Sequence, residues 1–473
     1  MEQKLRIYNT LGRKMEDFKS IRDKEVGLYT CGLTVYNYAH IGNLRTYIFE
    51  DILQRVLEWD GYKVKRVMNI TDVGHLTSDA DEGEDKLDKE ARAEMKSPEE
   101  IALAYTKAFI EDLTKLNVEV PELLKPASQE IEAQLDLVKK LFEKGFAYET
   151  DGAVYFDTSK LADYGKLTGQ KLSDKSVGSR EEVVVDPEKR NPTDFALWFK
   201  LVGRFKNHLM HWPSPWGEGF PGWHLECSAI STKYLGQPFD IHTGGVDHIG
   251  VHHTNEIAQS EGAYGKPLAN YWMHSEFLLI DGAKMAKSQG NFFTLKDIEK
   301  HDILPLAFRY LVLGAHYRTQ MNFTWESMES AAIGLKNLYD SYYRLSEAAK
   351  GEKNRTAFSA DAQKYLERFS EAINDDLNTP KALAVLQDTL RSPLAAGEKL
   401  TLIGKFDTVF ALFNTSVKAK AGKIPEEVAE LVKKREEARR NKQFVQSDAF
   451  RAEVEKLGYV IEDTPEGPVV RPK

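Results

Sequence analysis

The chain carries a small set of side chains with the chemistry of a soft metal site. Cys31 follows an apolar run, and Cys227 ends the segment Gly-Trp-His-Leu-Glu-Cys. His252 and Glu256 are four residues apart, a spacing that places both side chains on one face of a helix. Two thiolates, an imidazole and a carboxylate suit a tetrahedral zinc site. His253, three residues before Glu256, is a competing donor.

Each of these residues taken alone also has an ordinary structural alternative. A cysteine is often a small buried hydrophobic side chain, and the His252–Glu256 pair would then lie on a solvated helix face. Sequence spacing does not decide whether the four side chains converge. Because the chain has two cysteines and no export signal, metal binding or catalysis is favoured over a disulfide.

A candidate phosphate site precedes a helical pattern that begins near Leu44. The tetrapeptide His40-Ile41-Gly42-Asn43 stands at this point, where a helix N-terminus offers unpaired N–H groups and a positive dipole end. Gly42 permits close approach of the backbone, and His40 can donate a hydrogen bond to a phosphate oxygen. The segment is not a Walker-type loop, and an ordinary helix start is the alternative.

Two lysines bounded by glycines form a third candidate. Lys284 and Lys287 lie between Gly282 and Gly290, among small residues. This composition suits a mobile loop that closes over a triphosphate and stabilises the charge that builds on the leaving pyrophosphate. A solvated turn is the alternative interpretation.

A strand–helix–strand unit is predicted to position these groups. Residues 26–31 predict a buried strand, the apolar spacing from Leu44 to Gly61 predicts a helix, and residues 64–70 predict a second strand. Ligands of such units bind at the carboxyl ends of the strands. We therefore expect Cys31, Thr71 and Asp72 at the mouth of the site.

The rest of the chain predicts additions to this unit. The stretch from about 75 to 210 is expected to be an insertion with an acidic surface run at 79–85, helices, and a hairpin over 147–156. From residue 305 the pattern is helical to about 414, residues 417–423 form a plausible linker, and the last fifty residues form a small charged unit.

Length, composition and charge bound the class of protein. The 473 residues suffice for about three domains, and 42% hydrophobic with 29% charged residues excludes wholesale disorder and collagen-like chains. No apolar run approaches the ~18 residues of a membrane span, and the first residues lack the apolar core of a secretory signal, so we expect a cytoplasmic protein. A net charge of −9 excludes a uniformly basic coat for nucleic acid.

Taken together and in this order, the motifs closely resemble the cysteinyl-tRNA synthetase family of class I aminoacyl-tRNA synthetases, essentially from end to end. The resemblance implies an α/β fold: a Rossmann-like catalytic domain over residues 1–300 with its insertion at about 75–210, a helical bundle domain over 301–416 that contacts the tRNA stem, and an anticodon-binding domain over 424–473. The segments that carry the resemblance are Cys31-Gly32-Leu33-Thr34-Val35-Tyr36, His40-Ile41-Gly42-Asn43, Asn69-Ile70-Thr71-Asp72, Gly222 to Cys227, the Gly-Gly-Val-Asp segment with His252 and Glu256, and Lys284 to Asn291.

The resemblance also implies roles for individual residues. One zinc ion per chain would be held by Cys31, Cys227, His252 and Glu256. His40 and Asn43 of the HIGH-like motif and Lys284 and Lys287 of the KMSKS-like loop would serve catalysis. Positions expected around the amino acid and ATP are Gly32, Thr34, Thr71, Trp223, His242, Gly244, Gly245, Asp247 and Lys287. Positions expected near the anticodon are Arg439, Phe444, Asp448 and Asp463.

The activity implied is that of a cysteine–tRNA ligase. L-cysteine and ATP, with its Mg²⁺, would give cysteinyl-adenylate, and the cysteinyl group would pass to the 3′ end of tRNA(Cys) in a monomeric enzyme. Zinc would select the substrate thiol over a serine hydroxyl, and a directly bonded group can discriminate by about 10⁴ or more. Editing is then unnecessary, and the insertion leaves little room for a hydrolytic domain.

Two other functions and three departures from the family pattern accompany this interpretation. A cysteine ligase of the mycothiol pathway lacks the C-terminal domain, and a zinc-stabilised RNA-binding protein would have lost catalysis, against which the intact lysines and His40 argue. Ala286 stands where the family usually has Ser, Val470 stands where Trp is common, and residues 73–81 depart from the commoner Ile-Asp-Asp-Lys pattern.

Overall fold

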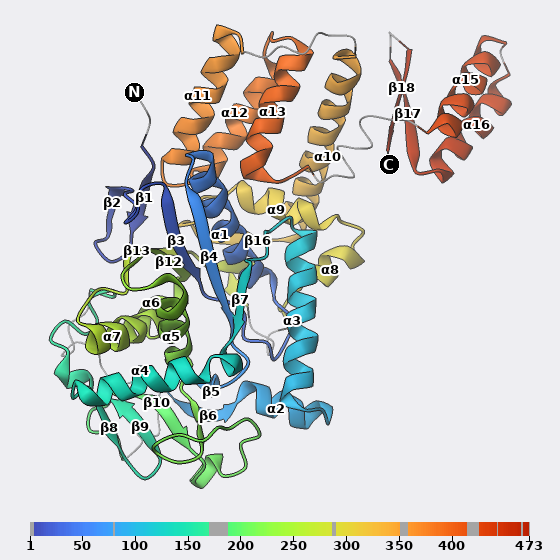
Figure 1. Ribbon diagram of the computed structural model, residues 1–473. Coiled ribbons are helices and arrows are strands. Elements are labelled where there is room, and N and C mark those ends of the chain that lie inside the picture. Colours follow the sequence, from blue (N-terminus) through green and yellow to red (C-terminus); the bar gives the residue numbers. More distant parts are fainter. Residues whose placement is uncertain are drawn as a thin grey trace. The chain divides into compact units, whose positions relative to one another are not determined.

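The computed structural model describes residues 4–78, 81–169, 188–285, 290–350, 358–413, 425–441, 443–464 and 467–472. The chain forms two compact units (Figure 1). The first unit consists of Met1–Pro305, Ala315–Thr324 and Asn374–Asn378, and the second of Leu306–Gly314, Trp325–Ile373 and Thr379–Lys473.

A five-stranded parallel sheet forms the centre of the first unit, with strand order β13-β12-β3-β4-β7. The strands are β3 (Glu25–Thr30), β4 (Lys63–Ile70), β7 (Leu123–Pro126), β12 (Phe239–Gly245) and β13 (Ala269–Ser275). The chain proceeds from β3 to one edge and later returns to β12 on the other side of β3. Ligands of doubly wound sheets bind where the strand order reverses in this way. The predicted Rossmann-like α/β class is confirmed.

Helices cover both faces of this sheet, as a parallel sheet requires. On one face, Arg66 of β4 pairs with Glu50 of α1 at 3.3 Å. On the other face, Tyr29 of β3 packs with Ile230 of α5 and Ile257 of α7 in one buried cluster. The bounds of these helices are α1 (Ile41–Trp59), α5 (Trp223–Leu235) and α7 (His252–Tyr264).

The stretch predicted as an insertion is not wholly separate from the main sheet. Within it β7, the four residues Leu123–Pro126, pairs in parallel with β4. So short a strand ending in proline gives little periodic signal. The helices of this stretch are α2 (Lys86–Glu94), α3 (Pro98–Lys115) and α4 (Ile131–Glu143). The strands β5 (Leu76–Ser78) and β6 (Glu82–Asp85) form an antiparallel pair before α2.

An antiparallel sheet of order β11-β10-β9-β8 completes this region. The predicted hairpin over 147–156 is confirmed by the pairing of β8 with β9. The strands are β8 (Ala147–Glu149), β9 (Ala153–Phe156), β10 (Phe195–Lys200) and β11 (Gly219–Pro221). Smaller elements of the first unit are β1 (Arg6–Asn9), β2 (Lys14–Asp17), α6 (Asp247–Gly250), β14 (Leu278–Ile280), β15 (Ala283–Lys284), α8 (Leu295–Lys300) and β16 (Met321–Phe323).

The second unit is helical before it ends in a two-stranded sheet. Its helices are α9 (Pro305–Leu313), α10 (Trp325–Ala348), α11 (Ala360–Asn374), α12 (Thr379–Arg391), α13 (Ala396–Phe410), α15 (Glu426–Arg440) and α16 (Phe444–Lys456), followed by β17 (Tyr459–Thr464) and β18 (Gly467–Pro472). Val428, Val454 and Ile461 form a small core between α15, α16 and β17. The predicted linker at 417–423 lies outside the described residues.

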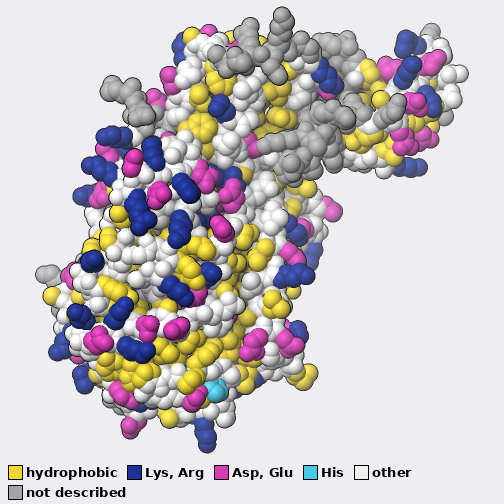
Figure 2. All heavy atoms as spheres, viewed as in Figure 1, with side chains coloured by type: hydrophobic (Ala, Val, Ile, Leu, Met, Phe, Trp, Pro, Cys, Tyr) yellow, Lys and Arg dark blue, Asp and Glu magenta, His cyan; other side chains and the backbone are white. Residues whose placement is uncertain are grey.

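The surface and the helices agree with the composition. On the face that Figure 2 shows, Lys and Arg side chains are interspersed with Asp and Glu, and no coat of one sign covers that face. Within the part of the chain that the structure describes, every helix is too short or too polar to cross a membrane.

Candidate active site

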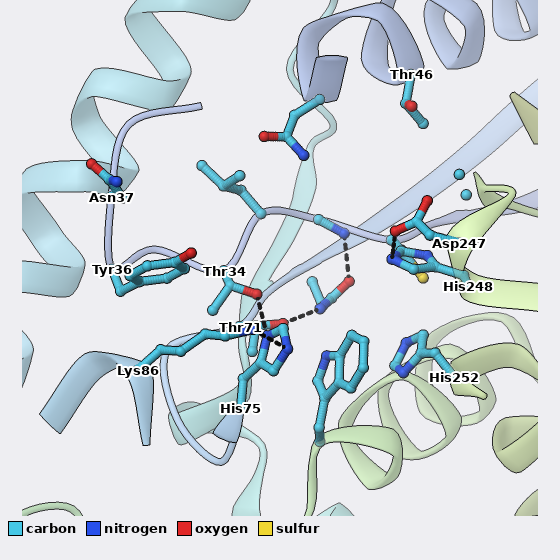
Figure 3. A pocket seen from close by; sticks show the side chains of 18 of the residues that line it. Thr34, Tyr36, Asn37, Thr46, Thr71, His75, Lys86, Asp247, His248 and His252 are labelled. Carbon is cyan, nitrogen blue, oxygen red and sulfur yellow. Dashed lines mark hydrogen bonds and ion pairs between the residues drawn. The ribbon is translucent and has the colours of Figure 1, made fainter. Parts of the chain in front are cut away.

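A cavity of about 330 Å³ lies at the carboxyl ends of β3, β4 and β12 (Figure 3). Cys31 directly follows β3, Thr71 directly follows β4, and Gly244 and Gly245 end β12. These are the strand ends at which the fold reverses its order, where a ligand is expected. The predicted site residues that line the cavity are Cys31, Gly32, Thr34, His40, Asn43, Thr71, Trp223, Cys227, Gly244, Gly245, Asp247 and His252.

Five buried donors meet beside this cavity, and we call Cys31, Cys227, His252, His253 and Glu256 the sulfur cluster. Donor atoms of all but Cys227 lie within 4.8 Å of one another, and the two Sγ atoms are 4.0 Å apart. Cys31 Sγ is 3.3 Å from His253 Nε2, and His252 Nε2 is 3.0 Å from Glu256 Oε1. The alternative of a solvated His–Glu helix face is wrong, since His252 is 2% and Glu256 0% exposed.

Three elements from distant parts of the chain bring these donors together. Cys31 comes from the end of β3, Cys227 from α5, and the other three donors from the first turns of α7. Although His252 Nε2 lies 3.0 Å away, Glu256 Oε1 is buried and makes no well-directed hydrogen bond among the described residues. Buried polar atoms are normally satisfied, so this orphaned carboxylate oxygen beside two sulfurs fits a bound cation.

Protonation in the cluster reflects burial and close charges. Burial alone would raise the pKa of the Cys31 thiol, but the hydrogen bond from Cys227 and the nearby His248 lower it to about 6. Burial and the adjacent Cys31 raise the pKa of Cys227 well above its usual value, and burial does the same for Glu256. A cation would favour the ionised form of both groups. Burial lowers the pKa of His252, so this imidazole is neutral, as a metal ligand must be.

His242 was predicted among the residues around the amino acid, but it does not line the cavity. It is fully buried behind the sulfur cluster, where its Nε2 lies 2.8 Å from Glu256 Oε2. Its ring stacks on Trp272 at a centroid distance of 4.4 Å. Once Glu256 is ionised, as a metal ligand is, its carboxylate can only accept, so the Nε2–H of His242 would donate to it and orient it.

His40 and Asn43 cap α1 reciprocally at the cavity wall. Asn43 N donates to His40 Nδ1 at 3.1 Å, and His40 N donates to Asn43 Oδ1 at 3.2 Å. Burial lowers the pKa of His40 to about 4, so the ring is neutral near pH 7. Since Nδ1 accepts a hydrogen bond, the ring proton resides on Nε2. The predicted helix thus begins at Ile41, and the cap leaves His40 one N–H to donate.

Gly32 and Asn69 hold the β3 and β4 ends together under the cavity. Gly32 N donates to Asn69 Oδ1 at 2.8 Å, and a Cβ at position 32 would stand 1.7 Å from the Asn69 carbonyl oxygen. Only glycine fits this approach. Thr71 Oγ1 donates to Glu226 Oε1, which also accepts from Asn69. Burial raises the pKa of Glu226 well above its usual value.

Several residues that line the cavity were not predicted from the sequence, notably His75, Lys86, Glu226 and His248. His75 is held on three sides: Nδ1 lies 2.7 Å from Thr34 Oγ1, Nε2 lies 2.7 Å from Lys86 Nζ, and the ring stacks on Trp223 at 4.0 Å (Figure 3). His75 falls in the segment that departs from the family pattern, and Lys86 follows the acidic run. The acidic residues between them in the sequence form no pattern that predicts contact between the two side chains.

His248 lines the cavity beside Asp247. Burial would lower the pKa of His248, but the nearby Asp247 and Cys31 raise it to about 10. Its Nε2 is 3.7 Å from Asp247 Oδ2. The sequence offered one indication of a role for His248: it directly follows Asp247, which was predicted to be a site residue.

Comparisons with known families and proteins agree with this geometry. Residues 17–333 match the family described as tRNA synthetases class I (C) catalytic domain. Residues 421–471 match a cysteinyl-tRNA ligase anticodon binding domain, and residues 368–392 match a DALR domain.

Relatives of similar length extend the match over nearly the whole chain. The cysteine--tRNA ligase of Treponema denticola is 44% identical, covering 97% of this chain and 98% of the relative. Cysteine--tRNA ligase 1 of Burkholderia lata is 46% identical, covering 98% of this chain and 96% of the relative. The chain belongs to the cysteine--tRNA ligase family.

Solved structures support the fold of this cysteine--tRNA ligase family member. Mycobacterium tuberculosis methionyl-tRNA synthetase in complex with methionyl-adenylate superposes with a TM-score of 0.59 at 15% identity, covering 84% of this chain and 92% of that one. LeuRS from Agrobacterium radiobacter, in a ternary complex, superposes with a TM-score of 0.63 at 11% identity, covering 86% of each chain. At these identities the likeness concerns the class I fold.

The two lysines of the KMSKS-like loop are only partly described in this family member. Lys284 is an exposed residue of β15, with its Nζ 4.6 Å from the centroid of the Phe277 ring, and it does not line the cavity. Lys287 and Ala286 lie outside the described residues.

The residues predicted near the anticodon lie in the second unit. Arg439 Nη1 is 2.6 Å from Asp463 Oδ1, and Arg435, which sequence reasoning missed, binds both Asp463 oxygens at 2.7 Å. The hydrogen bonds from these arginines lower the pKa of Asp463 to about 2. Phe444 is 62% exposed at the start of α16, and Asp448 is exposed on the same helix. Val470 pairs with Ile461 across β17 and β18.

Proposed function

We propose that this chain is a cysteine–tRNA ligase that activates L-cysteine with ATP and transfers the cysteinyl group to the 3′ end of tRNA(Cys). The observation that carries the proposal is the sulfur cluster in the wall of a class I synthetase cavity. Full-length relatives named cysteine--tRNA ligase support it.

One zinc ion per chain fits the donors beside the cavity. Cys31, Cys227, His252 and Glu256 would hold it, with His253 as the competing fifth donor, and the unpartnered Glu256 Oε1 supports this assignment. Bound zinc supplies a soft electrophilic position that a substrate thiolate occupies well and a serine hydroxyl poorly. His242 contributes by holding the second oxygen of Glu256.

The chain's own groups orient the reactants of the first step. The N-terminus of α1 and the Nε2–H of His40 donate to ATP phosphate oxygens, and Asn43 keeps the His40 ring in place. Lys284 and Lys287 stabilise the charge of the departing pyrophosphate together with the Mg²⁺ that accompanies ATP. Asp247 attracts the substrate ammonium group, and Trp223 and Thr71 form the wall around the amino acid.

Two substitutions at different centres make up the reaction. A cysteine carboxylate oxygen attacks the α-phosphorus, a new P–O bond forms, and the bond to pyrophosphate breaks. A terminal ribose hydroxyl of tRNA then attacks the activated carbonyl carbon, loses its proton, and releases AMP. Positioning and charge stabilisation suffice for the first step, so no covalent enzyme intermediate is needed.

Particular residues argue against each of the two rival functions. The match of residues 421–471 to an anticodon binding domain disfavours a ligase that joins cysteine to a small amine. The capped His40 at the cavity wall disfavours a non-catalytic RNA-binding protein.

We further propose that the enzyme acts as a monomer in the cytoplasm.

The test is ATP–pyrophosphate exchange with cysteine and with serine, followed by charging of a tRNA(Cys) transcript. We expect exchange with cysteine that exceeds exchange with serine by about 10⁴, and cysteine-dependent charging of the transcript. Exchange without charging would favour the small-amine ligase, and no exchange would leave the RNA-binding alternative.

Lys287→Ala should reduce adenylate formation strongly while changing ATP affinity little.

A further inference from the structure

A second group of buried donors lies in the same unit, and we call Asp85, Asp88 and His208 the oxygen cluster. One ligand atom from each residue lies within 4.8 Å of the others. Asp85 caps the N-terminus of α2, Asp88 stands in the first turn of that helix, and His208 follows β10 in the chain. Their exposed fractions are 3%, 4% and 7%, so little water reaches them.

The tautomer of His208 is set by a backbone carbonyl. His208 Nδ1 lies 2.7 Å from the Met210 oxygen, and because a carbonyl can only accept, Nδ1 carries the proton. In the neutral ring, Nε2 then directs a lone pair toward Asp85 Oδ2 at 3.6 Å and Asp88 Oδ2 at 3.9 Å. Three electron-rich atoms therefore face one another in a buried space.

Nothing in the described part of the chain satisfies this nitrogen. His208 Nε2 is buried and makes no hydrogen bond there, and separations of 3.6 and 3.9 Å exceed those of N–H···O bonds. Two ligand atoms about 2.1 Å from one tetrahedral ion lie about 3.4 Å apart. The spacing is close to that of a shared ion and too wide for direct hydrogen bonds.

We propose that the oxygen cluster binds a divalent transition-metal ion, of which Zn²⁺ and Mn²⁺ best suit the donors. Two carboxylates offset the charge of the ion, and an imidazole favours a transition metal over Ca²⁺ or Mg²⁺, which prefer oxygen ligands alone. The carbonyl that fixes the His208 tautomer matches the outer hydrogen bond that metal-binding histidines usually make.

Backbone groups hold both carboxylates in place for this role. Asp85 Oδ1 accepts from Leu87 N at 2.8 Å, and its Oδ2 accepts from Gly74 N at 2.7 Å. Asp88 Oδ2 accepts from Leu209 N at 3.0 Å. The Oδ2 atoms of Asp85 and Asp88, which face His208, each accept one of these bonds and keep a second lone pair, so the carboxylates are oriented and still have capacity for an ion.

Among the described residues, the Arg92 guanidinium approaches the cluster. Arg92, half exposed, has its Nη2 3.7 Å from Asp88 Oδ2 and its Nη1 3.9 Å from Glu84 Oε1. Its long distance and exposure make it a weak partner for Asp88. The His208 ring is covered by Phe220, with which it stacks at 3.7 Å.

The ion would fix a segment that reaches the cavity. Lys86 follows Asp85 in the chain, its backbone N donates to the His75 carbonyl at 3.0 Å, and its Nζ lies 2.7 Å from His75 Nε2. Both side chains line the cavity. A metal at Asp85, Asp88 and His208 therefore joins the loop after β10 to the segment that carries His75 and Lys86.

The test counts metal ions in the full chain by elemental analysis, after chelation, reconstitution with Zn²⁺ and exhaustive dialysis. We expect two zinc ions per wild-type chain and one in His208→Gln, which keeps a side chain able to donate to the Met210 carbonyl. The matched control is His211→Gln, because His211 is exposed and pairs with Glu218 at 2.9 Å; it should keep two.

Reconstitution with Co²⁺ tells the two clusters apart. Sulfur-to-cobalt charge-transfer absorption reports the sulfur cluster alone, so His208→Gln should retain this band while losing one ion. One ion per wild-type chain, or equal counts in the wild type and His208→Gln, would overturn the proposal. If circular dichroism shows that His208→Gln does not fold, Asp88→Asn decides by the same count.

Discussion

The sulfur cluster and the oxygen cluster are both buried groups of metal donors, but they differ in how the chain builds them. The sulfur cluster draws donors from the end of β3, from α5 and from α7, and it stands at the wall of the cavity. The oxygen cluster takes two donors from the N-terminal cap and the first turn of α2, and a third from the loop after β10. An ion at the first location would lie within reach of a substrate, whereas an ion at the second would lie between two segments of the chain.

The donor atoms of the two clusters differ in chemistry, and the difference matches their locations. Thiolates suit an ion that must accept a further sulfur ligand, while carboxylates with one imidazole suit a harder, structural ion. If both ions bind, residues at the carboxyl ends of the sheet would carry the chemistry, and residues within the insertion would stabilise the segment that completes the cavity.

Cys227→Ala is expected to give the largest difference between its effects on the two clusters. Removing one sulfur should abolish zinc binding at the sulfur cluster and reduce cysteine-dependent ATP–pyrophosphate exchange by about 10³-fold or more, while the ion at the oxygen cluster remains. Exchange kinetics and metal content, measured on one preparation, check this. Ser231→Ala is the control, since Ser231 lies on the same helix and donates to a backbone carbonyl. Full zinc content in Cys227→Ala would contradict the ligand assignment.

A smaller loss of activity should occur without any change in metal content in His40→Ala. The variant loses the cap of α1, at a cost of about 1 kcal/mol, and the N–H that donates to phosphate, so exchange should fall about 10²-fold. Both clusters should keep their ions. If zinc were lost together with activity, the cap and the sulfur cluster would be one structural unit and the comparison would fail.

Zinc binding at the sulfur cluster should release about two protons near pH 7. The pKa values of Cys227 and Glu256 are raised in the metal-free protein, so both hold protons that zinc must displace. Zinc affinity should therefore fall as the pH falls. The folding stability of the metal-free protein should depend on pH in the opposite direction. Groups with raised pKa values stabilise the fold most at low pH, and this stability is lost as the pH rises.

Calorimetry of zinc binding in buffers with different ionisation enthalpies measures this release. Glu256→Gln is the matched variant and should release about one proton fewer, if it still binds. A release independent of both groups would show that neither ligates the ion.

The smallest expected effect concerns Arg92 beside the oxygen cluster. In Arg92→Gln the competing cation near Asp88 is removed, so affinity for Mn²⁺ or Zn²⁺ should rise about two- to fivefold, the range of a weak exposed pair. Titration with Mn²⁺, followed by electron paramagnetic resonance, checks this. A lower affinity in the variant would mean that Arg92 helps to hold the carboxylates rather than competing for them.

The two clusters also show what sequence reasoning reaches. The sulfur cluster was predictable because the chain has two cysteines and because His252 and Glu256 have helical spacing. His208 and Asp88 were not singled out, since one histidine among 12 and one acid among 73 acidic residues carry no pattern. Rare residue types in a fixed spacing are visible in one dimension, whereas common types brought together by tertiary structure are not.

The fold repeats this lesson in particular elements. The helix after His40 was predicted to begin near Leu44 and begins at Ile41, because His40 itself is the cap. The acidic run at 79–85 was expected on the surface, yet Asp85 is 3% exposed, since its carboxylate accepts three backbone N–H groups. Local side-chain-to-backbone bonds of this kind depend on where the chain turns, which residue types alone do not reveal.

Trp223 lies between two histidines that belong to different parts of the site. One face of its indole stacks on His75 at 4.0 Å and the other packs against His252 at 4.3 Å. The indole is thus a rigid spacer whose thickness sets how near His75 can come to His252 of the sulfur cluster. A smaller side chain at 223 would let the two imidazoles approach each other and would change the shape of the cavity that all three residues line.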